Sequence, residues 1–551
     1  MLYFILFLGA LVFFHEFGHF IVARLVGVKV LRLSIGFGPK LVGFTRSGTE
    51  YWLALIPLGG YVKLLGDDPE KQEVDVDPRQ GFFTTDLWRR ILIVLAGPIF
   101  SLLLPVLLFF PMFVLRSELP PSVVGSVAVG GPAWQAGLRP GDRVVEALGR
   151  EIKYFWQLQE VVESNPGQAV PVVVDRGGER REFVVTPATV EDPIFREIGF
   201  SVKTGRIEVT LESSRPVVLV EPGGAAFRSG MGQFLSLVQR VRVFEDPMVL
   251  PLVALLSVDG RDVSDFEQAS EALAHVKERA VKVRVAATSD RPDDLGPVAE
   301  FVIGPTEEGP GLLDGSGVVT FVEPGSPAKQ AGIRQSDRIV SVDGKAFSNW
   351  LFMVSTLERA PDEEHTFGLV GPDGSHREVR FSLKNPAWTP GSGVSRYAFG
   401  AYGRRAVLDP SPVPNEDRLY YATNRTIAQT SHVFKVTVAA LVGLFVGRVS
   451  VREVGGPIMI YQVASVAGQR GWSDFFNAMA WLSMSIGILN LLPIPIMDGG
   501  NLLMFAIEAV RRRPIGSAGW RTARYVGLVV LMALAVLVFS NDLSRLAMGG
   551  R

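Results

Sequence analysis

The feature that most constrains this chain is a metal-binding pattern placed inside an apolar segment. Residues 1–23 form an apolar run, and within it the letters FFHEFGHF place His15, Glu16 and His19. Two histidines four residues apart lie on one face of a helix, about one turn apart, so both imidazoles can reach one metal ion. In HExxH enzymes the histidines hold Zn²⁺, and the glutamate takes a proton from metal-bound water so that the water can attack a carbonyl group.

The location of this pattern argues against a chance occurrence, although the same five letters are found in many unrelated chains. An acidic side chain at the centre of a spanning helix costs about 2.5–3.5 kcal/mol, so an unpaired Glu16 beside two histidines should be scarce there. A cleaved secretory signal is also disfavoured. No Lys or Arg precedes Arg24, and cleavage would discard the motif itself.

Length and composition predict several domains, some within a membrane and some outside it. The chain has 551 residues with 48% hydrophobic and 20% charged residues, and its mean hydropathy is +0.26, which is high for a soluble protein. The net charge of -1 gives no indication of a nucleic-acid partner. Because the chain has no cysteine, it has neither disulfides nor thiolate ligands, and any zinc must be bound by His, Asp or Glu.

Four apolar segments are predicted to span a bilayer, the last of them being shorter than the others. They are residues 1–26, 91–115, 475–500 and 525–540. Asp498 is the only charged residue of the third segment. A further apolar segment, residues 433–446, is short and contains Lys435, so we expect a helix at the membrane interface there rather than a span.

Basic residues in two short loops predict the orientation. The loops are residues 27–90 and 501–524, and their Lys and Arg residues are Lys29, Arg32, Lys40, Arg46, Lys63, Lys71, Arg79, Arg89, Arg90, Arg511, Arg512, Arg513, Arg521 and Arg524. Since such residues favour the cytoplasmic side, both loops should be cytoplasmic. The stretch from residue 116 to about residue 474 and both termini, including the tail 541–551, then face outward. The metal lies nearer the cytoplasmic side.

The first of these loops is predicted to form β-structure. Its segments SIGFGPKLVGF and TEYWLALIPLGGYVKLL alternate short β-prone runs with Gly and Pro, which indicates strands and turns rather than helix. So apolar a β-region should associate with the membrane beside the active site, because irregular backbone is permitted there if it lines a cavity. The alternative is a small soluble hairpin.

The outward region contains internal repeats. Residues 127–152 and 320–347 match almost position for position, and residues 218–231 with 255–266 form a third, degenerate copy interrupted by an insert. The pattern resembles the PDZ domains of bacterial envelope proteases, with expected bounds of 116–208, 209–306 and 311–386, followed by a linker with juxtamembrane helices over 387–474. PDZ domains capture peptide C-termini or strands by adding a strand to a sheet edge. The alternative is that these domains are spacers or size filters that bind no peptide.

A third metal ligand is predicted far downstream, in the letters NLLPIPIMDGG at residues 490–500. A catalytic zinc needs three protein ligands plus water. The other histidines lie outside the apolar segments, so Asp498 is the intramembrane candidate. Pro493 and Pro495 interrupt the helix, which lets the chain present Asp498 toward the metal. The alternative is an Asp at a helix terminus on the membrane surface.

With these residues assembled, the chain resembles the site-2 protease family of intramembrane zinc metalloproteases over nearly its whole length. The matching letters are HEFGH, NLLPIPIMDGG, GFGP, IPLGGYVKLLG, AGP and, near the C-terminus, SNDLSRL. Three features depart from the family pattern. Met497 replaces the usual Leu, Ser101 stands where the family often has Asn, and the PDZ-like copies are three where the best-known members have two.

The resemblance implies that His15, His19 and Asp498 bind Zn²⁺, and that Glu16 is the general base and later the acid toward the leaving amine. It also implies that Asn490 holds the substrate strand or stabilises the tetrahedral intermediate. The residues expected beside the substrate are Pro493, Pro495, Gly59 and Gly60. Similar proteins cut single-pass membrane proteins, such as an anti-sigma factor already shortened by a first protease, and clear leftover signal peptides.

We therefore expect a multi-pass α-helical membrane protein of the bacterial inner membrane. It should have about four transmembrane helices, a membrane-associated β region and tandem extracytoplasmic PDZ domains of the α+β class. A hypothesis from another class is a membrane-anchored PDZ scaffold or chaperone with a vestigial metal site. The intact motif argues against it, because a relic should have lost at least one of His15, Glu16, His19 and Asp498.

Overall fold

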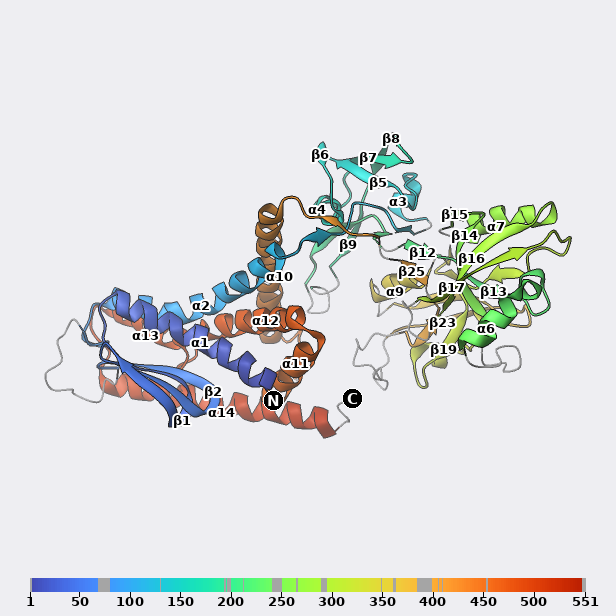
Figure 1. Ribbon diagram of the computed structural model, residues 1–551. Coiled ribbons are helices and arrows are strands. Elements are labelled where there is room, and N and C mark those ends of the chain that lie inside the picture. Colours follow the sequence, from blue (N-terminus) through green and yellow to red (C-terminus); the bar gives the residue numbers. More distant parts are fainter. Residues whose placement is uncertain are drawn as a thin grey trace. The chain divides into compact units, whose positions relative to one another are not determined.

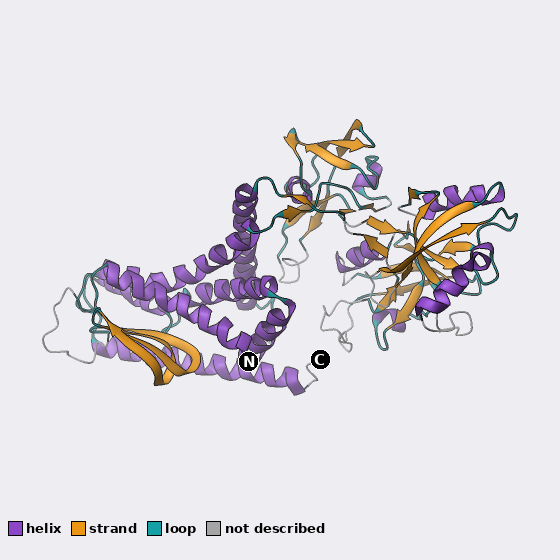
Figure 2. Cartoon of the chain, in the orientation of Figure 1, coloured by secondary structure: helices purple, strands orange, loops and turns teal. Residues whose placement is uncertain are grey.

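The structure is a computed structural model of the chain, and it forms two compact units (Figure 1). Unit 1 comprises residues 1–117, 197–200 and 415–550, and unit 2 comprises residues 118–196 and 201–414. The residues described are 2–67, 80–128, 130–192, 195, 200–211, 213–239, 250–263, 266–288, 295–347, 349–359, 363–383, 399–404, 406–408, 410–451 and 454–547. Helices dominate unit 1 and strands dominate unit 2 (Figure 2).

Unit 1 consists of helices around α2, together with one β-hairpin. Its elements are α1 (Leu2–Leu25), β1 (Val30–Arg46), β2 (Thr49–Leu64), α2 (Leu87–Val114), α10 (Arg418–Val446), α11 (Pro457–Arg470), α12 (Trp472–Asn490), α13 (Asp498–Arg511) and α14 (Ser517–Ala547). Helix α2 is central because it packs against α1, α10, α12 and α13. Three prolines within α2 do not end the helix.

The contact between α1 and α2 is unusually close because it is built on glycine. A Cβ atom added to Gly18 would overlap the backbone of Ala96, and one added to Gly97 would overlap the ring of His19. Small residues of this kind let two helix backbones approach each other in a membrane. The side chains of α1 that face α2 therefore lie directly against its backbone.

Within the described residues, four helices are long and apolar enough to cross a membrane: α1, α2, α10 and α14, the last over Ser517–Ser544. This agrees with the predicted first, second and fourth spans. Residues 433–446 were predicted to form a helix at the membrane interface rather than a span, but they are the second half of the 29-residue α10, which is long and apolar enough to cross a membrane. The apolar run begins at Val433, whereas the helix begins at Arg418, and Tyr421 near its start contacts Phe113 of α2.

The predicted third span, 475–500, is not one helix and is not among these four. Helix α12 ends at Asn490 and α13 begins at Asp498, with Pro493 and Pro495 in the break between them. A proline has no backbone N–H for the helix ladder, so the two prolines favour this interruption. Polar residues such as Asp474 also lower the mean hydropathy of α12.

The β-structure predicted between the first two spans is present as the antiparallel hairpin β1–β2. Several of its apolar side chains are exposed, among them Leu41, Val42, Phe44, Leu55 and Ile56. Lys71 and Arg79, two of the basic residues from which the orientation was predicted, lie outside the described residues. Exposed apolar side chains on a hairpin are unusual for a water-facing β-structure.

Unit 2 contains three large hydrophobic cores, each with its own sheet, and a smaller apolar cluster that joins the second sheet to Ala406. The first involves β3 (Glu118–Leu119), β4 (Ser126–Val127), α3 (Pro132–Gln135), β5 (Arg143–Ala147), β6 (Arg150–Glu151), α4 (Phe155–Glu163), β7 (Val170–Arg176), β8 (Glu179–Val185), β9 (Ala188–Glu191), β10 (Lys203–Arg206) and β11 (Val209–Thr210). The second involves β12 (Ser213–Arg215), β13 (Val217–Val220), α6 (Gly232–Gln239), β14 (Leu252–Val258), β15 (Arg261–Asp262), α7 (Phe266–Ala274), β16 (Val281–Thr288), β17 (Leu295–Ile303) and β18 (Leu312–Asp314). The third involves β19 (Val319–Val322), α8 (Pro327–Gln330), β20 (Arg338–Val342), β21 (Lys345–Ala346), α9 (Trp350–Arg359), β22 (His365–Val370), β23 (His376–Phe381) and β24 (Ala401–Gly403). Strand β25 (Ala406–Leu408) pairs with β12 of the second, and β26 (Val413–Pro414) pairs with β3 of the first.

The three sheets share one strand order, which follows the predicted repeat. The orders are β6-β5-β7-β8, β15-β14-β16-β17 and β21-β20-β22-β23. Each first hairpin turns through two residues with positive φ, and the second of them is Gly149, Gly260 or Gly344. Such a turn matches the twist of the flanking strands and favours glycine. The degenerate middle copy thus keeps the backbone of the other two.

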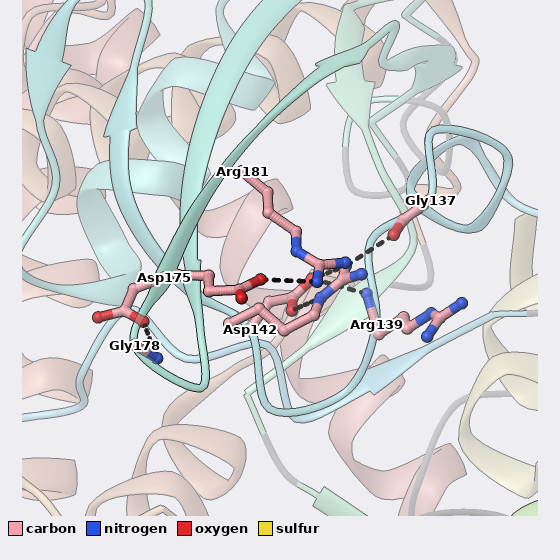
Figure 3. Close-up of polar contacts among 8 residues, drawn as sticks. Gly137, Arg139, Asp142, Asp175, Gly178 and Arg181 are labelled. Atoms are coloured by element: carbon pink, nitrogen blue, oxygen red, sulfur yellow. Dashed lines mark hydrogen bonds and ion pairs between the residues drawn. The ribbon is translucent and has the colours of Figure 1, made fainter.

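One polar cluster is present in the first and third copies. In the first copy Asp142 accepts a hydrogen bond from the backbone N–H of Arg139 (Figure 3). It also accepts hydrogen bonds from the guanidinium group of Arg176. These bonds to Asp142 raise the pKa of Arg176. Asp337 makes the corresponding contacts with Arg334 and Arg377 in the third copy.

Candidate metal centre

Helices α1 and α13 bring three potential metal ligands together. The Nε2 atoms of His15 and His19 lie 3.3 Å apart. The Oδ2 atom of Asp498 is 3.2 Å from His15 Nε2 and 3.5 Å from His19 Nε2. Within the described part of the chain, these three residues are the group of His, Cys, Asp or Glu side chains spaced so that it could hold a metal ion. The predicted ligand set is thus assembled from residues almost 480 positions apart in the sequence.

The spacing of the three atoms fits a tetrahedral zinc site. Ligands about 2.1 Å from a tetrahedral zinc ion lie about 3.4 Å from one another. The three distances between the ligand atoms of His15, His19 and Asp498 all lie between 3.2 and 3.5 Å. Two imidazoles and one carboxylate leave the fourth position for water or substrate, as catalytic zinc sites require.

Helix α2 orients both imidazoles through contacts to their Nδ1 atoms. His19 Nδ1 lies 2.8 Å from the backbone carbonyl oxygen of Ile93, and His15 Nδ1 lies 3.0 Å from the hydroxyl oxygen of Ser101. A carbonyl oxygen can only accept, so His19 carries a proton on Nδ1, which leaves Nε2 as the nitrogen that can bind a metal. Outer partners of this kind fix the orientation of metal-binding histidines. Ser101, which stands where the family often has Asn, therefore contacts His15.

Close packing around Gly97 completes this side of the site. A Cβ atom at Gly97 would overlap His19 Nε2 and would come 2.9 Å from His15 Cε1. The α2 residues that contact the two histidines are Ile93, Gly97 and Ser101, which recur every four positions. Gly97 was not among the predicted site residues. This helical spacing around the AGP letters is the signal that could have found it.

The break between α12 and α13 presents Asp498 at the first position of α13. The chain folds back so tightly that a Cβ atom at Gly499 would overlap the carbonyl of Leu492, and one at Gly500 would overlap the carbonyl of Ile494. Ile496 has a φ of 87°, which is a strained conformation for a β-branched residue. The two glycines after Asp498 are therefore required by the backbone of the loop itself.

Glu16 lies between the ligands and the hairpin. The backbone of Val62 in β2 lies close to its carboxylate. A Cβ atom at Gly60 would come 3.3 Å from Glu16 Cγ, so the absence of a side chain there leaves room for Glu16. Gly59 has a φ of 113° and lies against the ring of Phe37. Gly60 is thus beside the proposed base, whereas Gly59 serves the shape of the hairpin.

Asn490 and the two prolines occupy different places. The amide nitrogen of Asn490, the last residue of α12, lies 3.3 Å from His15 Nε2. Pro495 packs its backbone against Gly527 of α14. Pro493 lies in the same break. The structure therefore brings Asn490 to the centre, while the prolines shape the loop that leads to Asp498.

The chain is similar over its full length to known proteins. Residues 3–534 match the model of Peptidase family M50. The "Regulator of sigma-E protease RseP" of Escherichia coli strain K12 is 28% identical, and the match covers 98% of each chain. The "Putative zinc metalloprotease" of Xylella fastidiosa strain 9a5c is also 28% identical, covering 97% of this chain and 96% of the relative.

Family membership, the ligand geometry and the apolar helices agree with one another. The family match spans both α1 and α13, so it includes all three ligands and Glu16. The expected cofactor Zn²⁺ fits the spacing of His15, His19 and Asp498. This chain belongs to Peptidase family M50 and is a membrane zinc metalloprotease related to RseP.

Proposed function

We propose that this enzyme hydrolyses peptide bonds within the transmembrane segments of single-pass membrane proteins. The substrates that the resemblance suggests are an anti-sigma-factor-like protein already shortened by another protease, and remnant signal peptides. The observation that carries the proposal is the position of the ligands. His15 and His19 lie in the second half of α1, a 24-residue helix that is apolar enough to span a bilayer.

Each residue of the centre has a defined part in the proposed reaction. His15, His19 and Asp498 would hold zinc, which supplies a Lewis acid that activates water and polarises the scissile carbonyl. Glu16 accepts the proton of the attacking water and then delivers it to the nitrogen of the leaving amine. The amide of Asn490 is close enough to His15 to donate a hydrogen bond to the oxygen that gains negative charge.

The β1–β2 hairpin is proposed to bind the substrate as an extended strand. A helical substrate keeps its peptide bonds in internal hydrogen bonds, so it must unwind locally before hydrolysis. The hairpin is a two-stranded sheet, and its strand β2 passes beside Glu16 at Gly60 and Val62. Pairing with a sheet edge would satisfy the backbone of the unwound segment. The exposed apolar side chains of the hairpin support its insertion into the membrane.

The three repeats of unit 2 are proposed to be extracytoplasmic PDZ domains that act as a size filter. Their shared strand order and separate cores support three domains. Peptide capture at a sheet edge remains the alternative role. In this proposal the enzyme resides in the bacterial inner membrane, and the two basic loops and the metal centre lie toward the cytoplasm.

The test is cleavage of tagged single-pass membrane proteins by the native chain and by Glu16→Gln. Each would be co-expressed with candidate substrates whose outer domain has been trimmed. Fragments cut within the spanning segment should form with the native chain and not with Glu16→Gln. If both proteins bind the substrates and neither cleaves them, the scaffold hypothesis replaces the proposal.

A further inference from the structure

Beside the metal centre, unit 1 has a cavity that its proposed chemistry does not use. Its volume is about 510 Å³, and its lining residues are Ile496, Asn501, Arg521, Arg524, Tyr525 and Leu528. The residues come from two places, the loop and first turns around Asp498 and the first turns of α14. The cavity therefore adjoins the segment that presents a metal ligand.

The lining combines hydrogen-bond donors and positive charge with an apolar wall. Arg521 and Arg524 are one turn apart on α14 and contribute two guanidinium groups. Guanidinium groups match phosphate oxygens in geometry and charge. Asn501 and Tyr525 add an amide and a hydroxyl donor. Ile496 and Leu528 give the cavity an apolar side, so the chemistry fits an amphipathic molecule that carries a phosphate.

The position of the cavity along α14 matches the level of lipid headgroups. From Tyr525 to Phe539 the helix has no charged residue, whereas both arginines lie within the turn that precedes this apolar stretch. Tyr and Arg at the end of a spanning helix lie where the bilayer meets water. Basic pockets between helices at this level bind the headgroups of anionic lipids.

We propose that this cavity binds the phosphate group of an anionic phospholipid and that the bound lipid steadies the loop carrying Asp498. The guanidinium groups of Arg521 and Arg524 bind the phosphate, and Leu528 and Ile496 contact the first part of the acyl chains. This inference requires the metal centre, but it does not require that the enzyme cut within membrane spans.

The coupling to Asp498 runs through the loop between α12 and α13. Ile496 lines the cavity and lies two residues before the ligand, in a strained backbone conformation. Its neighbour Pro495 packs directly on Gly527 of α14, which lies one turn after Arg524. Asn501 lies one turn after Asp498 on α13. A lipid held between these residues opposes relaxation of the loop, and so it slows the loss of Asp498 from the metal.

The first measurement is lipid retention by the purified, zinc-loaded full chain. Native mass spectrometry detects the lipids that stay bound when the protein is released from micelles containing phosphatidylcholine and phosphatidylglycerol. The double variant Arg521→Gln with Arg524→Gln should retain at least about tenfold less phosphatidylglycerol than the native chain. The charge-matched control is Arg511→Gln with Arg513→Gln, since neither of these arginines lines the cavity. Equal retention by the two double variants would overturn the proposal.

The second measurement is the rate at which a chelator removes zinc, which needs no substrate. In vesicles containing phosphatidylglycerol, the native chain and the control variant should lose zinc several-fold more slowly than in phosphatidylcholine alone. The Arg521→Gln, Arg524→Gln variant should show no difference between the two lipids. Protection by inorganic phosphate in phosphatidylcholine vesicles would reassign the cavity to free phosphate and overturn the lipid proposal.

A third variant keeps the test decisive if removing both arginines prevents zinc loading. Leu528→Trp fills the cavity from an exposed position on α14 and leaves every charge in place. It should lose both the retention of phosphatidylglycerol and the lipid dependence of zinc loss. If Leu528→Trp keeps native retention and native lipid dependence, the lipid is bound elsewhere and the proposal fails.

Discussion

The guanidinium group of Arg90 and the carboxylate of Glu508 form a buried pair of hydrogen bonds, 2.9 and 3.2 Å long, that joins α2 to α13. Both residues are less than a tenth exposed. Helix α2 orients the two histidines and α13 carries Asp498, so this ion pair holds together the two elements whose positions determine the metal centre.

Removing one member of this pair should destabilise unit 1 and loosen the zinc site. Arg90→Met leaves Glu508 as an uncompensated buried charge, which costs about 3–5 kcal/mol. Thermal unfolding and zinc content would be measured together, with the neighbouring Arg89→Met as the control. The double variant Arg90→Met, Glu508→Leu should recover most of the loss, because an apolar pair can replace a buried ion pair. Equal stability of Arg90→Met and native protein would contradict this prediction.

Replacement of the third ligand should remove the metal. Asp498→Ala leaves two imidazoles, and since loss of an outer partner alone costs 10–100-fold, loss of a ligand should weaken zinc binding by more than about 100-fold. Metal analysis of the purified protein checks this. Val510→Ala, at an exposed position near the end of α13, is the control that should keep its zinc. Undiminished zinc in Asp498→Ala would show that the assignment of this ligand is wrong.

Loss of the proposed base Glu16 should abolish cleavage without removing zinc. Glu16→Gln keeps the size of the side chain but cannot accept the proton of the attacking water, so cleavage should be abolished while zinc is retained. Zinc content and substrate cleavage are measured on the same preparation. A variant that cuts at a near-native rate would mean that another residue is the base.

The metal centre should not tolerate a methyl group at Gly97. A Cβ atom at this position would overlap His19, so Gly97→Ala should displace an imidazole and lower the zinc affinity by at least about tenfold. Gly9→Ala on α1 is the matched control, because nothing lies within 4 Å of its added Cβ atom. The control should be neutral or up to about 1 kcal/mol more stable, since Ala is a better helix former than Gly. Similar zinc affinities of the two variants would refute the close contact.

The size-filter hypothesis predicts a gain of activity on deletion. Removing residues 121–384 and joining the ends by a flexible linker should preserve the metal site and permit cleavage of untrimmed substrate. Zinc content and cleavage of trimmed substrate establish that the shortened chain is folded. If it still rejects untrimmed substrate as strongly as the full chain does, selectivity resides in unit 1, where the β1–β2 hairpin would be the first element to test.

The sequence by itself determined what depends on local spacing. The i, i+4 separation of His15 and His19 predicts their shared helix face, because the helix period alone places them there. Alternation of β-prone runs with glycine predicted the β-structure of β1 and β2, and the matching repeat segments predicted copies of one fold, which share one strand order. The prolines before Asp498 predicted the break between α12 and α13.

Only the tertiary structure decided which distant residues support the ligands. The contacts of His15 with Ser101, of His19 with Ile93 and of Arg90 with Glu508 join positions between 74 and 418 residues apart. The full length of α10 was missed for a related reason. Its polar first half gives no apolar signal in the sequence, and the helix it belongs to packs against α2. Local periodicity reports the face of a helix, but the partner of that face depends on how the whole chain packs.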